Sequence, residues 1–187
     1  MGKLLEDIYN SLPKSRFNWV DENKTVLEVT DALIFWKHFN DTPNQFGSKV
    51  RYFCLALPDD VGDELSKRGW KVKDHPVDDP ANQDCRYIKY ISVKINMASD
   101  FPPTVVALSE YKGKKSRVVH TEATLGELDR LYFKSACVKI RAYPNPRLST
   151  PENPKITAYL SKALIEVEPV VEFNGFYDDW DNPEVND

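Results

Sequence analysis

Aromatic and basic side chains recur together along this chain, most densely between residues 33 and 73. Flat rings can stack on nucleic-acid bases, and cations beside them can neutralise phosphates. A single aromatic residue proves little, because aromatic rings commonly fill protein cores. We expect the two kinds together to form a nucleic-acid interface from Trp36, Lys37, Lys49, Arg51, Tyr52, Trp70, Lys71, Lys73, Lys89, Tyr90, Lys94, Tyr111, Lys112, Lys114, Lys115, Arg117, Lys139 and Arg141.

Four of these cations surround one predicted turn: Lys112, Lys114 and Lys115 lie within residues 111–115, and Arg117 lies just beyond it. A basic hairpin tip of this kind could wrap a nucleic-acid strand, as the loops of oligonucleotide-binding barrels do. A solvated turn accounts for the same charges, and the sequence leaves both interpretations open.

Charge is distributed unevenly along the chain. The net charge is −4, yet no Lys or Arg follows Lys162, and 8 of the 29 acidic residues lie beyond it. Residues 1–162 therefore carry 21 acidic against 25 basic residues, a net charge of +4. We interpret residues 172–187 as an acidic flexible tail, with Asp178, Asp179, Trp180, Asp181, Glu184 and Asp187 as residues for partner contacts or autoinhibition.

The sequence offers no arrangement for catalysis or metal binding. The three Cys and three His residues are widely scattered, whereas zinc ligands come in closely spaced pairs. Acidic residues at 59–64 lie at the predicted start of a helix, and we interpret their negative charges as favourable to the positive end of the helix dipole. No phosphate-binding or dinucleotide-binding glycine motif is present. We therefore expect no enzyme, no cofactor and no metal.

The elements that would position these residues are mostly short strands. Apolar spacing predicts a helix over 3–12, and acidic residues before Gly69 predict a second helix after Pro58, with Asp59 as its cap. Thr124 and Glu127 form a capping box for a helix over 125–131. Strands are expected at 25–30, 32–39, 50–57, 70–73, 87–96, 104–110, 116–122, 138–143 and 156–167, with loops at 40–48 and 74–84.

Alternation within these strands divides core from surface. Phe53, Leu55 and Leu57 form the expected core face of the strand over 50–57, which places Tyr52 outside. The whole pattern predicts a mainly β protein, a Greek-key barrel of five or six strands with short helices. A β-sandwich is the alternative architecture. The expected organisation is a helical extension over 1–24, a barrel over 25–171 and the acidic tail over 172–187.

Several sequence blocks resemble, in the same order, a family of small phage-type single-stranded DNA-binding proteins with an oligonucleotide-binding (OB) fold. The resemblance runs from Leu33 to Glu168 and rests on IFWKHF, RYFCLALPD, GWKVK, YIKYISVKIN, PPTVVAL, VKIRAYPNP and KITAYLSKALIEVE. It implies a non-catalytic role in DNA replication, recombination or repair, with aromatic rings that stack on bases. It also implies that the tail mimics DNA or contacts replication proteins.

We therefore expect a sequence-tolerant single-stranded DNA-binding protein, which could also form a homo-oligomer. The alternative is a β-rich protein-interaction or virion-associated protein that does not bind DNA; a metal-dependent nuclease lacks grouped ligands. No apolar run approaches the length of a membrane span, and the N-terminus lacks a signal-peptide pattern. An odd number of scattered cysteines fits a cytoplasmic protein, in the host cell if the chain is phage-encoded.

Overall fold

The computed structural model describes residues 2–43, 45–47 and 49–169. Ten strands form one sheet in this part of the chain, which confirms the prediction of a mainly β fold. The sheet has more strands than the five or six expected and is not closed. Its elements are α1 (Gly2–Ser11), η1 (Leu12–Lys14), β1 (Arg16–Trp19), β2 (Val26–Thr30), β3 (Ile34–His38), β4 (Arg51–Leu57), α2 (Asp59–Lys67), β5 (Lys73–Pro76), β6 (Tyr87–Ile95), β7 (Thr104–Tyr111), β8 (Lys114–His120), η2 (Leu125–Arg130), β9 (Phe133–Pro144) and β10 (Ile156–Val167).

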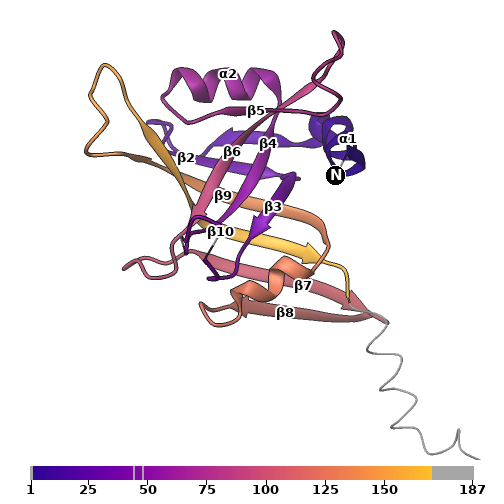
Figure 1. Cartoon of the computed structure of the whole chain (residues 1–187). Coiled ribbons are helices and arrows are strands. Elements are labelled where there is room, and N and C mark those ends of the chain that lie inside the picture. Colours follow the sequence, from indigo (N-terminus) through magenta and orange to yellow (C-terminus); the bar gives the residue numbers. More distant parts are fainter. Residues whose placement is uncertain (1, 44, 48, 170–187) are drawn as a thin grey trace, which may run out of the picture.

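The main path through the sheet runs β1-β2-β9-β10-β6-β4-β3. Strand β10 changes partner along its length: Ala158 and Tyr159 pair in parallel with β6, whereas residues 162–166 pair in parallel with β7. A register shift against β9 lies between Leu160 and Lys162, where the partner changes. In Figure 1, β6 leaves the β9–β10 pair at a steep angle, whereas β7 runs alongside β10. The β6–β7 connection therefore lies at a fork in the sheet.

The concave side of the sheet holds the main core. Phe53, Leu55 and Leu57 are fully buried there, as their alternation predicts. Leu65 of α2 and Leu125 and Leu128 of η2 add to the same cluster from outside the sheet. Burying one such side chain stabilises the fold by about 1.5–3 kcal/mol.

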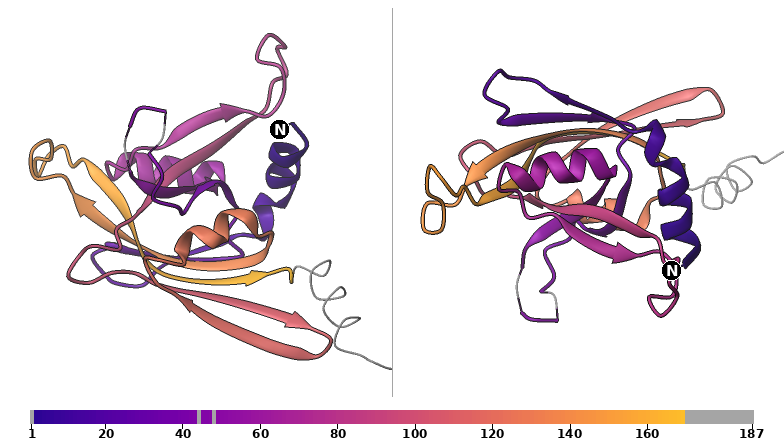
Figure 2. Two further views of the ribbon diagram at one scale, coloured as in Figure 1. Left: turned by 60° about the horizontal axis from the view of Figure 1, so that its bottom comes forward. Right: turned by 90° about the horizontal axis from the view of Figure 1, so that it is seen from above.

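Helix α1 covers part of the opposite, outer face of the sheet. Its Leu5 and Ile8 are buried against a second cluster that includes Phe35, Ala56 and Ile88. Figure 2 shows α1 lying along one side of the sheet, separate from α2. The segment predicted as a helical extension thus packs on the outer face, and it also contributes β1, which the sequence analysis missed.

Several local predictions need correction. Residues 70–73 form no continuous strand: Trp70 makes an isolated bridge to Ile156, and β5 begins only at Lys73 and extends into the expected loop over 74–84. Pro58, rather than Asp59, occupies the cap position of α2, and no side chain caps it. The reason is that Asp59 already belongs to the helix, where it still complements the dipole.

The predicted capping box also fails. The segment after Thr124 is a 3₁₀-helix without a side-chain cap, and Thr124 Oγ1 instead accepts a hydrogen bond from the backbone of Thr121 at 2.9 Å. Gly69 ends α2 as predicted, with φ of +89°. A β-carbon there would also approach the carbonyl oxygen of Pro154 to 2.0 Å, so only glycine lets the β9–β10 loop pack against the end of α2.

Candidate nucleic-acid interface

A row of aromatic and basic residues crosses five strands on the outer face of the sheet. Register pairs His38 with Tyr52, Tyr52 with Lys94, Lys94 with Tyr159, and Tyr159 with Arg141. Directly opposed residues share one face of a sheet, so these side chains form a continuous line across β3, β4, β6, β10 and β9. We call these five residues the outer row. Neighbouring strands lie about 4.8 Å apart, so the outer row spans roughly 19 Å.

The three rings of the outer row are partly exposed, and each lies beside another ring. The His38 and Tyr52 ring centroids are 5.5 Å apart, and those of Tyr159 and Tyr143 are 5.9 Å apart. The second pair meets at an interplanar angle of 86°, so one ring stands upright beside the face of the other. Such rings offer flat surfaces on which unpaired bases can stack.

The two cations of the outer row are available to an external anion. Lys94 and Arg141 are exposed, and neither forms an ion pair within the described part of the chain. Arg141 presents five donors in a planar fork, and Lys94 provides a compact charge. Both therefore suit phosphate or an acceptor-rich base edge.

A pocket of about 450 Å³ opens at the Arg141 end of the outer row. Three segments form its walls: the β6–β7 connection, β9, and β10 at its register shift. The lining residues are Asn96, Ser99, Phe101, Pro102, Pro103, Arg141, Tyr143, Tyr159, Leu160 and Ser161. Phe101 is 89% exposed and Tyr143 is 52% exposed, so the pocket has aromatic surface at its rim.

A second aromatic group borders the outer row near β5. The Trp36 ring makes edge contacts with the rings of Phe35, His75 and Tyr90, at 4.8, 4.8 and 5.6 Å. Trp36 has φ of +47°, an unfavourable conformation for a bulky residue, and lies at the β3 register shift. Exposed Lys73 pairs in register with Tyr90, so a cation lies beside this group.

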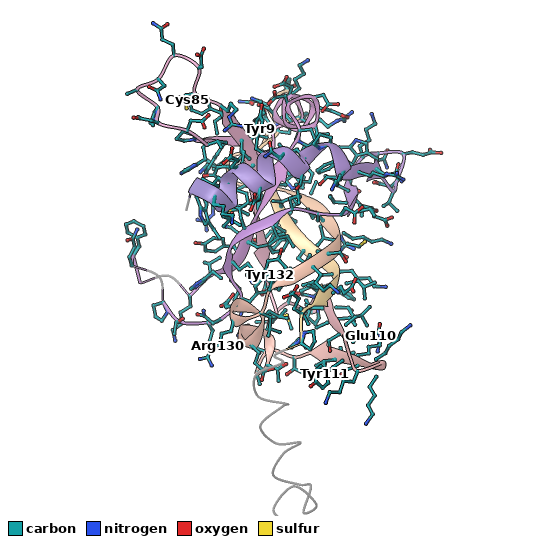
Figure 3. All side chains as sticks on the ribbon, turned by 90° about the vertical axis from the view of Figure 1, so that its right-hand side faces the viewer. Tyr9, Cys85, Glu110, Tyr111, Arg130 and Tyr132 are labelled. Atoms are coloured by element: carbon teal, nitrogen blue, oxygen red, sulfur yellow. The ribbon has the colours of Figure 1, made fainter. Side chains whose placement is uncertain are left out.

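The predicted basic turn forms the end of the β7–β8 hairpin. Lys112 and Gly113, with φ of +49° and +77°, make the turn, and Lys112 Nζ lies 5.2 Å from the Tyr111 ring centroid. Lys114, Lys115 and Arg117 are all exposed on β8. Figure 3 shows Tyr111 at this hairpin, far from Cys85 in the β5–β6 loop. Strand β7 pairs with residues 162–166 of β10, beyond Tyr159, so the hairpin is a basic surface separate from the outer row.

The remaining predicted residues lie elsewhere, and several have structural partners. Trp70 is only 5% exposed and belongs to the main core, so its ring is inaccessible to a base. Arg51 is 7% exposed, because it shares the inward face with Phe53; its Nη2 donates to the carbonyl of Glu122 at 3.0 Å. We exclude both from the interface. Lys49 and Lys71 are exposed and lie off the outer row.

Three other predicted cations are bound within the fold. Lys37 Nζ donates to the carbonyls of Leu128 and Leu131 and lies 4.0 Å from the Phe133 ring centroid; burial lowers its pKa. Lys89 bridges Asp63 and Asp74 at 3.6 and 3.5 Å. Lys139 pairs with Glu28 at 3.4 Å across β9 and β2. These cations stabilise contacts between elements and are less available to DNA than Lys94 and Arg141.

The sequence analysis missed four residues that the structure adds: His38, Asn96, Phe101 and Tyr159. Tyr159 lies in a correctly predicted strand, but its position beside Lys94 depends on a parallel pairing of β6 and β10. No local pattern reveals such a pairing. The tail residues at 178–187 lie outside the described residues, and their expected role stays a prediction.

Other kinds of site are not evident in the described residues. No group of three or more His, Cys, Asp or Glu side chains there could hold a metal ion. All three cysteines are free. No described helix is long and apolar enough to cross a membrane.

Comparisons with solved structures find similar chains of modest fold similarity. The single-stranded DNA-binding protein of bacteriophage Enc34, in a C-terminally truncated form, is 14% identical, with a TM-score of 0.43 over 78% of this chain and 87% of that chain. The same phage protein in complex with single-stranded DNA is 17% identical, with a TM-score of 0.42 over 78% and 88% of the two chains. No curated protein matches the sequence.

A family model matches the chain more directly. The family is described as "Putative phage ssDNA-binding domain", and its model matches residues 19–167. This range includes every strand from β2 to β10, the outer row and the pocket. The chain belongs to this family of phage single-stranded DNA-binding domains.

Proposed function

We propose that this protein binds single-stranded DNA along the outer row, without catalysis and largely without regard to sequence. The observation that carries the proposal is the register of His38, Tyr52, Lys94, Tyr159 and Arg141, which places three rings and two cations side by side across five strands. Rings that stack on the faces of bases tolerate any sequence, and cations bind the phosphates. The strand would cross the β-strands of the sheet rather than run along them.

The part of the outer face that α1 covers supports this path for the DNA strand. Helix α1 buries Phe35, Ala56 and Ile88, so a nucleic acid has no access to those positions. The outer row begins beside this covered area and ends at the pocket. A strand on the outer row would therefore meet His38 and Tyr52 first and Arg141 last, or the reverse.

The β7–β8 hairpin provides a second basic surface. Lys114, Lys115 and Arg117 are exposed and lack ion pairs among the described residues. We propose that this hairpin contacts phosphates of a longer strand that extends beyond the outer row. Its contribution would be electrostatic and would weaken at high salt.

The acidic tail is proposed to compete with DNA for these cations. Residues 172–187 carry six carboxylates and no cation, so they repel phosphate and attract basic surfaces. The same tail could contact replication proteins, which would place the protein in phage DNA replication, recombination or repair.

Titration of fluorescent oligo-dT tests the proposal directly. Neutralisation of four phosphates gives a log–log slope of affinity against salt of roughly −3 for single strands. Duplex DNA of the same length should bind more weakly, because its bases are not free to stack, and an RNA oligonucleotide measures the preference between the two nucleic acids. No binding to oligo-dT at low salt, or binding indifferent to salt, would disprove the function and favour a protein-interaction role.

A further inference from the structure

The pocket beside Arg141 differs in chemistry from the rest of the outer row. It is a concave space of about 450 Å³, whereas the other ring and cation positions lie on the open surface of the sheet. Its aromatic residues come from different directions: Tyr143 and Tyr159 from adjacent strands, Phe101 from the β6–β7 connection. The two tyrosine rings meet at 86°, which forms a corner that can hold a flat ring against one face and one edge.

Two nitrogen-bearing side chains at the pocket, Arg141 and Asn96, offer hydrogen-bond donors, and the hydroxyls of Ser99, Ser161, Tyr143 and Tyr159 can donate or accept. Arg141 is a donor only and has no ion pair among the described residues. Asn96 Oδ1 accepts a hydrogen bond from the backbone of Ala98 at 3.2 Å, which leaves the amide nitrogen of Asn96 to donate. A ligand that fits this pocket should therefore present acceptors to Arg141 and Asn96 and a flat face to the rings.

Guanine matches this requirement best among the DNA bases. Its O6 and N7 atoms are adjacent acceptors, the pair that an arginine fork contacts most often. Adenine places an amino donor beside N7, cytosine carries an amino donor, and thymine places a methyl group beside its single exposed acceptor on that edge. A purine also covers more of a tyrosine ring than a pyrimidine does.

We infer that the pocket binds one unstacked base of the DNA strand and prefers guanine, which Arg141 and Asn96 recognise while Tyr143 and Tyr159 enclose the ring. The inference rests on the proposed function, because the outer row must deliver the strand to the pocket. It adds a specificity site to an interface that is otherwise tolerant of sequence. One nucleotide of the bound segment should therefore matter more than the others.

The test uses oligo-dT of about 12 nucleotides, within the range of site sizes of OB-type folds. One dG, dA or dC replaces a dT at successive positions, and binding to the full chain is measured by anisotropy. A dG at an interior position should raise affinity about tenfold over all-dT, the scale of one bidentate base contact. A dA or dC at the same position should change affinity less than twofold.

The ratio of the affinity for the dG-containing oligonucleotide to the affinity for all-dT measures the preference for guanine. Variants of the pocket residues test whether the pocket causes this preference. Arg141→Lys retains the charge and removes the fork, so the ratio should fall close to one. Asn96→Ala should reduce the ratio several-fold. Lys94→Ala lies on the outer row outside the pocket, and it should weaken both oligonucleotides equally and preserve the ratio.

The possible failures are distinct. Salt-dependent binding of all-dT with no dG advantage at any position overturns the pocket inference and leaves the proposed function intact. An equal gain from dA and dG would show that ring size alone decides, and a dG advantage that survives in Arg141→Lys would place recognition elsewhere; either result overturns the inference. If neither oligonucleotide binds at low salt, the proposed function and the inference both fall.

Discussion

Two parts of the outer face of the sheet differ although they lie on the same strands. Under α1, strands β3, β4 and β6 present Phe35, Ala56 and Ile88, which are fully or almost fully buried. Further along, β4 and β6 present Tyr52 and Lys94, which remain partly or largely exposed. The outer face is therefore divided into a part that the chain covers itself and a part that it leaves open.

The difference follows from residue type. Small and apolar residues gain free energy when a helix removes them from water, whereas a lysine loses hydration if it is buried without a partner. Helix α1 accordingly ends its contact before Lys94 is reached. An open sheet surface that combines rings with unpaired cations is better explained by a ligand than by folding.

The largest expected effect tests the covered part. Leu5→Ala on α1 should lower the free energy of unfolding by about 2–5 kcal/mol, the usual cost of truncating a buried leucine. Its neighbour Leu4 is 47% exposed, so Leu4→Ala should cost less than about 1 kcal/mol. Urea unfolding measures both. If Leu5→Ala is as mild as Leu4→Ala, α1 does not hold the outer face as described.

Ring truncation tests the open part. Tyr159→Ala should weaken oligo-dT binding by about 1–3 kcal/mol, the loss of one stacked base, and Tyr159→Phe should bind almost as the parent does. Tyr132→Ala is the matched control, because Tyr132 is exposed beside η2 (Figure 3) and is not part of the outer row. Equal affinities for the two alanine variants, both confirmed as folded by circular dichroism, would remove Tyr159 from the interface.

Removal of tail charge tests whether the open part of the outer face also attracts the acidic residues of the tail. Deletion of residues 177–187 removes five carboxylates and should tighten oligo-dT binding up to about tenfold at low salt. The gain should fade near physiological ionic strength, where the screening length is about 8 Å. A variant in which the five carboxylates are replaced by Asn or Gln controls for chain length. Unchanged affinity at every salt concentration, or loss of folding on deletion, would contradict the proposed competition.

The smallest expected effect distinguishes two lysines of strand β6, Lys94 and Lys89. Lys94→Ala should make the salt slope shallower by about 0.7, the contribution of one phosphate contact to a single strand. Lys89→Ala lies on the same strand, but Lys89 bridges Asp63 and Asp74, so the slope should not change. Titrations of both variants with oligo-dT at several salt concentrations measure the two slopes. Equal slopes for Lys94→Ala and the parent would exclude Lys94 from phosphate binding.

The sequence predicted which residue types the candidate interface would contain, but it did not predict how they are arranged in space, and their role in binding stays a prediction. Alternation in 50–57 placed Phe53 in the core and Tyr52 outside, and the structure agrees. The same alternation also placed Arg51 on the core face, so its burial could have been foreseen from that pattern. Trp70 follows Gly69 at the end of α2, and its burial depends on packing with β10, a segment 86 residues later.

Local sequence therefore determined most elements of this protein. Periodicity, turn residues and breakers act over a few residues, and they identified α1, α2, the β7–β8 hairpin and most strands. The mainly β class and the family resemblance also came from these local blocks and their order. Charge asymmetry could be counted directly, because it needs no coordinates.

Only the tertiary structure decided which of these strands are neighbours. The parallel pairing of β6 with β10 places Lys94 beside Tyr159, and the register of β10 with β9 then adds Arg141. The division of β10 between β6 and β7 creates the fork at which the pocket lies. Such long-range pairings depend on burial and backbone hydrogen bonding summed over the whole sheet, so no short stretch of sequence encodes them.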